Sequence, residues 1–282
     1  MLSSIVRSLS RRTWVAGAAL AILAGAGIAR ADKSPYSFVY EVDATSHFIS
    51  YGADVWGGGS EISPFSPHST VFASGTVTAA LADNLSVYLN IWSDNNDNVA
   101  SGLGGDIQEI DVNTGVTYTW DKLSFTLAHG FWNYAGEQEK VIDLTVAFGD
   151  GDMITQSKSI SLNPSVNIHY RYEGNNGQES GVAAVFGIAP SYTLMPDTKY
   201  PLTLSAPISV ALFQDGFQGG DSGYGFFSAG VGLSVPLAFI PEKYGAWSTG
   251  VSVTYYNTPS ETVPNNPEEN FVTSMLTIKA AF

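Results

Sequence analysis

The chain has 282 residues, a formal net charge of −14 and no cysteine; 13% of its residues are charged and 12% are aromatic. The lack of cysteine excludes disulfides, thiolate metal sites and cysteine nucleophiles, and the acidic balance excludes the basic surface that nucleic-acid binding needs. Soluble domains carry about 25% charged residues, so this low share, together with many aromatics, favours a protein that faces lipid.

Residues 1–31 are predicted to be a secretory signal peptide. Arg7, Arg11 and Arg12 supply a positive start, an apolar stretch follows, and Ala29-Arg30-Ala31 fits an A-x-A cleavage site. Cleavage after Ala31 would remove four arginines and no acid, so the net charge would change from −14 to −18 over the remaining 251 residues. After residue 31 no stretch offers the roughly 18 consecutive apolar residues of a membrane helix.

From residue 32 onwards apolar and polar residues alternate with a period of two, in runs of about ten that Gly, Asn, Asp and Pro separate. This pattern predicts an all-β chain that forms one transmembrane antiparallel up-and-down β-barrel over 32–282. About twelve strands are expected, an even number as in single-chain bacterial outer-membrane barrels. The runs are 37–49, 69–81, 85–94, 107–120, 122–134, 139–149, 161–172, 180–194, 202–213, 224–237, 246–256 and 270–282.

The run 107–120 shows the alternation most clearly. Ile110, Val112, Tyr118 and Trp120 share one face, and acidic, Asn and Thr residues share the other. His129 falls on the apolar parity of its run, which predicts a bulge or an interface position there. Aromatics near strand ends are expected to form the two interface girdles; they are Trp92, Tyr118, Trp120, Phe131, Trp132, Tyr134, Tyr255, Tyr256 and Phe282.

The connections fall into two classes if both chain ends lie on the periplasmic side. The outer ones are polar, rich in Gly, Asn and Asp, and mostly long, whereas several periplasmic ones are tight. This asymmetry is typical of outer-membrane barrels. The expected long outer loops are 50–68, 95–106, 173–179, 214–223 and 257–269.

The last run, 270–282, has the form of a lipid-facing strand. Leu276, Ile278, Ala280 and Phe282 lie on one face, and the terminal aromatic would anchor at the bilayer interface. A terminal Phe is also a feature that bacterial outer-membrane barrels share. By that resemblance, we expect the outer-membrane assembly machinery to recognise Leu276, Ile278 and Phe282.

Three motifs in residues 43–149 resemble the TorF-type porin family, also called the Gcw-chp family. Residues 46–52, SHFISYG, are similar to its S-x-Y/F-x-x-R-G segment at the end of the first strand. Residues 88–95, YLNIWSDN, resemble Y-x-G-x-W-x-S-N, and residues 109–115, EIDVNTG, resemble E-I/L-D-x-x-x-G. The chain departs at Tyr51, where Arg is common, and at Asn90, where Gly is usual. The resemblance implies an outer-membrane barrel and supplies no catalytic site.

The predicted lumen holds more acids than bases. The candidates for lining and selectivity are Glu41, Asp43, Glu109, Asp111, Asp143, His169, Arg171 and Lys279. We expect a porin-like channel in a Gram-negative outer membrane, through which small hydrophilic solutes diffuse passively with a preference for cations. The alternative is that inward ion pairs fill a narrow closed barrel. Lys279 has the parity to meet Glu41 or Asp43 where the last strand closes on the first.

His47, His129 and His169 are the residues that an enzyme could use, but no nucleophile motif such as G-x-S-x-G accompanies them. The sequence therefore predicts no catalytic activity, no cofactor and no metal site. Outer-membrane lipid, the assembly machinery and small solutes are the expected partners, and the oligomeric state stays open. Two other classes remain: a closed barrel that interacts through acidic outer loops, and a soluble secreted β-sandwich that binds carbohydrate.

Overall fold

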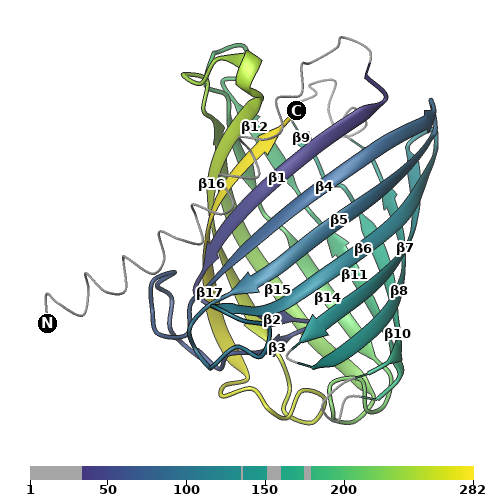
Figure 1. Ribbon diagram of the computed structural model, residues 1–282, viewed down its shortest axis with the longest axis vertical. Coiled ribbons are helices and arrows are strands. Elements are labelled where there is room, and N and C mark those ends of the chain that lie inside the picture. The colour runs from purple at the N-terminus through teal and green to yellow at the C-terminus, as the bar shows by residue number, and fades with distance from the viewer. Residues whose placement is uncertain (1–33, 135, 151–159, 175–178) are drawn as a thin grey trace, which may run out of the picture.

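The computed structural model describes residues 34–134, 136–150, 160–174 and 179–282 (Figure 1). Twelve strands pair antiparallel with their neighbours, and β1 pairs with β17 to close the ring. The fold is therefore the closed barrel that the sequence predicts, and the two-sheet sandwich is wrong. The predicted signal peptide, 1–31, lies outside the described residues.

The ring strands match the twelve predicted runs closely. They are β1 (Tyr36–Thr45), β4 (Thr70–Ala82), β5 (Leu85–Asn95), β6 (Ile107–Trp120), β7 (Leu123–Tyr134), β8 (Glu137–Phe148), β10 (Ser165–Glu173), β11 (Gly181–Ile188), β14 (Ile208–Phe213), β15 (Gly223–Pro236), β16 (Ala246–Asn257) and β17 (Asn270–Ala281).

Five short strands lie outside this ring: β2 (Ile49–Ser50), β3 (Ala53–Asp54), β9 (Ile160–Ser161), β12 (Ser191–Leu194) and β13 (Leu202–Ser205). A proline stands in each of the gaps between β9 and β10, β11 and β12, and β13 and β14: Pro164, Pro190 and Pro207. Proline has no N–H to give to a ladder and interrupts strands for that reason. Three of the predicted runs are therefore split in two.

The outward face of the ring is apolar. Large exposed side chains follow one parity along each strand and include Val77, Leu89, Val116, Leu127, Leu144, Ile168, Val231, Val251 and Ile278. A band of this kind suits contact with lipid hydrocarbon. Among the described residues no helix is long and apolar enough to cross a membrane.

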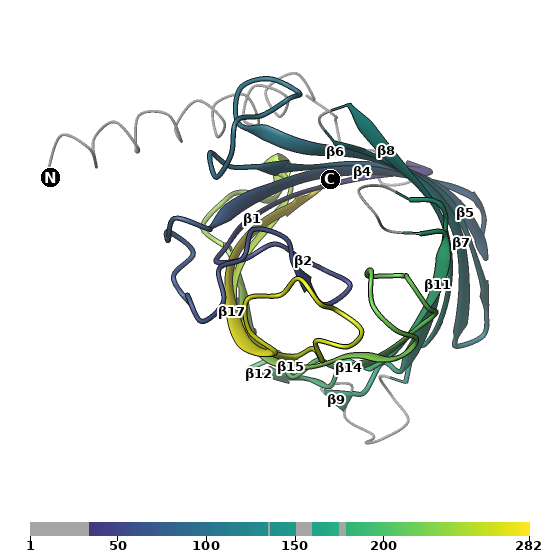
Figure 2. The same ribbon diagram turned by 90° about the horizontal axis from the view of Figure 1, so that it is seen from below.

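We call the end of the barrel where β1 begins and the chain finishes the terminal end, and the opposite end the loop end (Figure 1). At the loop end three segments, 46–69, 214–222 and 258–269, fold into the ring rather than away from it (Figure 2). We call these segments the plug. They correspond to the predicted outer loops 50–68, 214–223 and 257–269, and their inward folding is a feature that the sequence does not predict. Phe217 and Val263 are buried inside the barrel, whereas Ile62 and Phe65 are exposed.

The plug brings a hydrophobic core into the lumen. Phe217 and Val263, from two plug segments, pack with Phe213 and Phe226 of the wall, and Tyr51 joins them. The plug segments are also joined by hydrogen bonds. The Gln218 amide donates to the carbonyls of Ser50 and Tyr51 at 2.9 and 3.1 Å. The loop-end half of the barrel therefore has a buried hydrophobic core between plug and wall, with cavities of about 290 Å³ and 190 Å³ beside it.

Candidate functional site

The lumen contains three groups of polar side chains: a latch inside the plug, a charged wall beside the plug, and an open polar vestibule towards the terminal end. Their geometry decides what the barrel can pass or bind.

The latch begins where the chain leaves β1. Instead of continuing as strand to residue 49, as predicted, the chain turns into the lumen and forms the hairpin of β2 and β3. Tyr51 and Gly52 both have positive φ, 46° and 80°. Two such residues are required by a type I′ turn, the favoured two-residue connection of a hairpin. The turn places the Tyr51 ring 4.4 Å from the His169 ring on the barrel wall.

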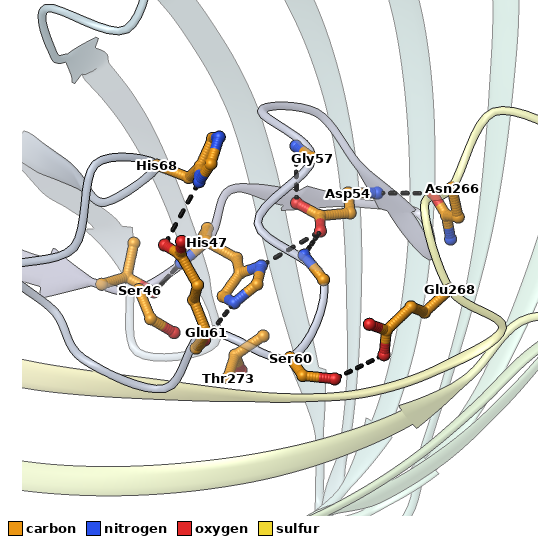
Figure 3. Close-up of polar contacts among 12 residues, drawn as sticks. Ser46, His47, Asp54, Gly57, Ser60, Glu61, His68, Asn266, Glu268 and Thr273 are labelled. Atoms are coloured by element: carbon orange, nitrogen blue, oxygen red, sulfur yellow. Dashed lines mark hydrogen bonds and ion pairs between the residues drawn. The ribbon is translucent and has the colours of Figure 1, made fainter.

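The carboxylate of Asp54, at the end of this hairpin, is a common hydrogen-bond acceptor for several residues of the plug (Figure 3). It accepts hydrogen bonds from Gly57 N at 3.2 Å and Gly59 N at 2.9 Å, and its Oδ2 lies 3.1 Å from His47 Nδ1. The Asp54 backbone N–H donates to Asn266 Oδ1 at 2.8 Å, which ties the first plug segment to the third. Both side chains of the His47–Asp54 pair are fully buried.

The two ring nitrogens of His47 both face acceptors: Nδ1 meets the Asp54 carboxylate and Nε2 meets the backbone carbonyl of Glu61. A neutral imidazole carries one N–H, so only the imidazolium satisfies both contacts. Burial lowers the pKa of His47, but the hydrogen bonds to Asp54 and to the Glu61 carbonyl outweigh it, and the pKa is raised overall. We refer to His47, Asp54 and the Glu61 carbonyl as the latch.

Space around the latch is tight. A Cβ on Gly58 would come within 2.5 Å of the His47 ring, so the loop can cross the ring only with glycine there. On its other side the His47 ring stacks on Phe271 of β17 at 6.1 Å. Next to the latch, hydrogen bonds from Ser66 and His68 lower the pKa of the Glu61 side chain. The plug is therefore held to the wall by packing as well as by hydrogen bonds.

The charged wall lies on β5 to β10, beside the plug. Arg171 Nε is 3.1 Å from Glu139 Oε2, and Arg171 Nη1 donates to the Phe217 carbonyl at 2.5 Å. His169 Nδ1 lies 2.9 Å from Asp143 Oδ1. Arg171 and His169 are 1% and 0% exposed. Inward ion pairs, which the sequence left as the alternative to an open lumen, are thus present in this half.

A carboxylate between two indoles stands on the same wall. The strand register places Asp111 of β6 opposite Trp92 of β5 on one side and opposite Trp132 of β7 on the other. Glu109, two residues from Asp111, shares its face. These four side chains, with Phe48, Ile49, Ser50 and Tyr51 of the plug, line a cavity of about 190 Å³.

The vestibule occupies the terminal-end half. Lys279 Nζ lies 3.0 Å from Glu41 Oε2 across the closing seam, so the pairing predicted from parity is present. Thr277 Oγ1 donates to Asp43 Oδ1 at 2.5 Å. The inner surface on β13 and β15 to β17 is built mostly from small residues, with Met275 beside them. They line a cavity of about 290 Å³ together with Glu41, Thr277 and Lys279, and they include Ser205, Gly232, Ser234, Ser248, Gly250 and Ser252.

The last strand faces outward as its alternation predicts. Leu276 and Ile278 are exposed on the outer surface. Phe282 stacks on Phe38 at 5.9 Å and meets Trp247 edge-on at 6.5 Å. These three rings form an aromatic group at the terminal rim, where an interface anchor would lie.

Part of the predicted aromatic girdle is wrong. Trp92 and Trp132 line the inner cavity, Tyr134 faces inward beside Glu109, and Tyr256 packs against the buried core. Trp120 and Tyr118, in contrast, are exposed on the outside.

His129 lies on the outer surface parity without a bulge in its pairings. Its Nε2 is 2.6 Å from the Tyr172 hydroxyl. The predicted bulge is therefore not formed. His129 instead lies on the outward face of the barrel, where the alternative prediction of an interface position places it.

None of the described histidine contacts joins a histidine nitrogen to a serine or threonine hydroxyl. His47 meets a carboxylate and a carbonyl, and His68 meets Glu61. His169 has Asp143 on Nδ1, while its Nε2 has no hydrogen-bond partner. A serine-type nucleophile needs its base within hydrogen-bond reach, so these contacts supply no activated hydroxyl.

Sequence reasoning missed Tyr51, Asp54 and Glu139 as site residues. Tyr51 and Asp54 lie in the predicted outer loop 50–68, where nothing in a period-two pattern indicates inward folding. For Trp92 a signal existed, since it shares parity with Asn90 on the polar face of its run. Its place near a strand end suggested a girdle residue instead.

No protein-family model matches the chain, and no curated protein matches its sequence, so the likeness to the TorF-type family stays a prediction. Among solved structures, the chain is similar to LpxR from Salmonella typhimurium (8% identity, 86% of this chain and 99% of that one, TM-score 0.47). It is also similar to an outer membrane channel from Pseudomonas putida F1 (11% identity, 91% and 98%, TM-score 0.46).

A third similar structure is the translocator domain of the autotransporter NalP from Neisseria meningitidis (10% identity, 98% and 97%, TM-score 0.39). At such identities and scores these likenesses carry no argument about function. The fold rests on the strand pairing given above, and the function on the site.

Proposed function

We propose that this protein is an outer-membrane channel for small hydrophilic solutes, favouring cations, which the plug holds closed at its loop end. In this proposal the terminal end faces the periplasm and the loop end faces the outside, as in other single-chain barrels. The apolar outward band supports residence in the membrane. The aromatic group at the terminal rim, with Leu276, Ile278 and Phe282, supports recognition by the assembly machinery.

The observation that carries the proposal is the lining of the vestibule. A barrel that serves only as a scaffold can fill its interior with large side chains. Here the inward positions of β15 and β16 are Ser, Gly and Thr over the terminal half: Gly230, Gly232 and Ser234 face Thr254, Ser252 and Gly250. Such residues leave a wide polar space, which a solute path needs.

The cation preference rests on the inner charges. Glu41 and Asp43 lie in the vestibule, where Lys279 is the cation that pairs with Glu41, and Asp143 stands beside the plug with His169. A lumen wall with excess negative charge raises the local concentration of cations and lowers that of anions. Glu109, Asp111, His169 and Arg171 lie deeper beside the plug, where a solute would meet them only after the plug moves.

Closure by the plug also supports a second candidate, a permanently closed barrel that acts through its outer surface. The hydrophobic packing of Phe217 and Val263 favours it. Planar-bilayer recordings separate the two. The wild-type protein is expected to show rare openings. Asp54→Ala removes the centre of the latch and is expected to show steady conductance steps, with a reversal potential in a salt gradient that indicates cation selectivity. A folded Asp54→Ala barrel that never conducts would favour the permanently closed barrel.

A further inference from the structure

The pairing of acidic and aromatic side chains beside the plug has a chemistry that passive diffusion does not require. We propose that Trp92, Asp111 and Trp132, with Glu109 on the wall and Phe48 and Tyr51 on the plug, form a binding site for a small organic ammonium cation. We call these six residues the cage.

Asp111 differs from the other buried acids of this wall because one of its oxygens has no partner, whereas Glu109 has hydrogen bonds with Asp111 and Tyr134. Asp94 receives hydrogen bonds from Trp56 at 2.8 Å, from Asn96 at 3.0 Å and from Thr70. Glu139 has Arg171. Asp111 is 7% exposed and lines the cavity, and its buried Oδ1 has no hydrogen-bond partner. A buried polar atom left unpaired is costly, and a bound cation would satisfy it.

Arg171 does not supply a positive charge to the carboxylates of the cage. Its guanidinium is engaged by Glu139 and the Phe217 carbonyl and lies 4.4 Å from the centre of the Phe217 ring. Glu109 and Asp111 are two neighbouring buried acids that hydrogen-bond to each other, so they share a proton when no cation is near. A positive ligand between them and the plug would stabilise the ionised form of the pair.

The walls of the cavity decide which cation fits. Four of its eight lining residues are aromatic, two of them tryptophans that flank Asp111 in register. Tryptophan faces attract cations most strongly among the aromatics, and aromatic cages are the usual means of binding quaternary ammonium groups. A metal ion needs several oxygen or nitrogen ligands, and no three His, Asp or Glu residues of the described chain converge in that way.

The size of the cavity also favours a small organic cation. The cavity of about 190 Å³ is smaller than the roughly 300–1,000 Å³ that drug-sized ligands occupy. It suits a head group such as trimethylammonium. Because Phe48 and Tyr51 belong to the plug, occupation of the cage would also bridge the plug to the wall. The cage goes beyond the proposed channel and does not require it.

The test is a binding titration on the folded protein in detergent, in which binding is measured by calorimetry and by tryptophan fluorescence. The probe is choline chloride, with sodium chloride as the salt control. The neutral isostere 3,3-dimethylbutan-1-ol has the same shape without the charge. We expect saturable binding of choline with a change in tryptophan emission, and binding of the isostere at least about tenfold weaker, since the cation–π and carboxylate attractions are lost.

Variants locate the site. Asp111→Asn is expected to weaken choline binding by about tenfold or more, and Trp132→Leu similarly. Glu109→Gln provides a second charge-removing variant if Asp111→Asn does not fold. The matched control is Glu41→Gln, which removes a lumen carboxylate from the vestibule and should leave choline affinity within about twofold, since a charge outside the cavity touches no ligand atom.

Three results would overturn the cage: no saturable binding of choline, equal binding of choline and the neutral isostere, or an equal loss of affinity in Glu41→Gln and Asp111→Asn. These outcomes are separate from the fate of the channel. A barrel that binds choline and does not conduct keeps the cage and refutes the channel, and one that conducts without binding does the reverse.

Discussion

The two halves of this barrel share one ring of strands and differ in what fills it. In the loop-end half the plug and the wall bury Phe217, Phe226 and Arg171. In the terminal-end half the inner surface of β15 to β17 is mostly Ser, Gly and Thr, with Met275 among them, and its ion pair, Glu41–Lys279, is partly exposed. Strand number therefore does not decide whether a lumen is open, because side-chain size and the course of the loops decide it separately at each level.

The largest difference between the halves should appear in their ion pairs. Arg171→Leu leaves Glu139 buried without its partner, since the two side chains are only 1% and 3% exposed. Removal of one member of a buried pair costs roughly 3–5 kcal/mol. We expect that loss in the free energy of unfolding, measured by urea titration of the detergent-folded barrel.

The control for Arg171→Leu is Lys279→Ala. Lys279 and Glu41 side chains are 48% and 31% exposed, and exposed pairs contribute about 0–1 kcal/mol. Equal losses in Arg171→Leu and Lys279→Ala would break the distinction between a packed half and a wet half.

The latch should come next in size. Asp54→Ala leaves the Gly57 and Gly59 N–H groups and His47 without their common acceptor. Loss of one buried acceptor costs about 1–3 kcal/mol, and we expect this loss in the unfolding free energy together with more frequent channel openings. Asp54→Asn keeps an acceptor oxygen and should lie between Asp54→Ala and wild type; openings unchanged in both variants would remove the latch from the account.

The latch should also respond to pH. The folded-state pKa of His47 is raised above its unfolded value of about 6.5. Its contribution to stability is therefore fully present below about pH 6.5 and is lost as the pH rises through the folded-state pKa. The groups that face it are the Asp54 carboxylate, the Glu61 carbonyl and the Phe271 ring of β17.

We expect the opening frequency in bilayers to rise as the pH is raised above 6.5. His47→Gln, which has no titrating ring, should open often at every pH and lose the dependence. A wild-type channel that opens more often as the pH falls towards 6 would contradict the role given to the imidazolium.

The smallest effect should come from the vestibule charges. In the Asp54→Ala background, Glu41→Gln removes a partly exposed carboxylate and should change the unfolding free energy by no more than about 1 kcal/mol. The reversal potential should nevertheless shift towards lower cation preference, since the lumen loses a negative charge. An unchanged reversal potential would show that selectivity is set elsewhere.

Sequence alone could predict the wall because the wall repeats. Each strand shows the same alternation, so Ile110 and Tyr118 indicate the outward face and Glu109 and Asp111 the inward one. The closing pair of Glu41 and Lys279 followed from parity. The plug does not repeat, and its fold depends on contacts between residues far apart, such as Asp54 with Asn266.

Aromatic residues show why parity outweighs position. Trp92 and Trp132 stand near strand ends, as girdle residues do, yet their inward parity places them in the cage. Phe282 satisfies both criteria and lies at the rim. Segment 46–52 resembled the end of a strand, but Tyr51 and Gly52 form a turn of positive φ inside the lumen, which a motif comparison does not indicate.

The most direct test of the two-halves account is thiol labelling, since the chain has no cysteine of its own. Ser252→Cys places a thiol in the vestibule, and Ala211→Cys places one in the packed core. In the folded barrel we expect a small polar maleimide to label Ser252→Cys at least about a hundredfold faster, since a buried thiol reacts only on opening. After unfolding in urea the rates should be equal. Equal rates in the folded barrel would contradict the claim that one half is hollow and the other packed.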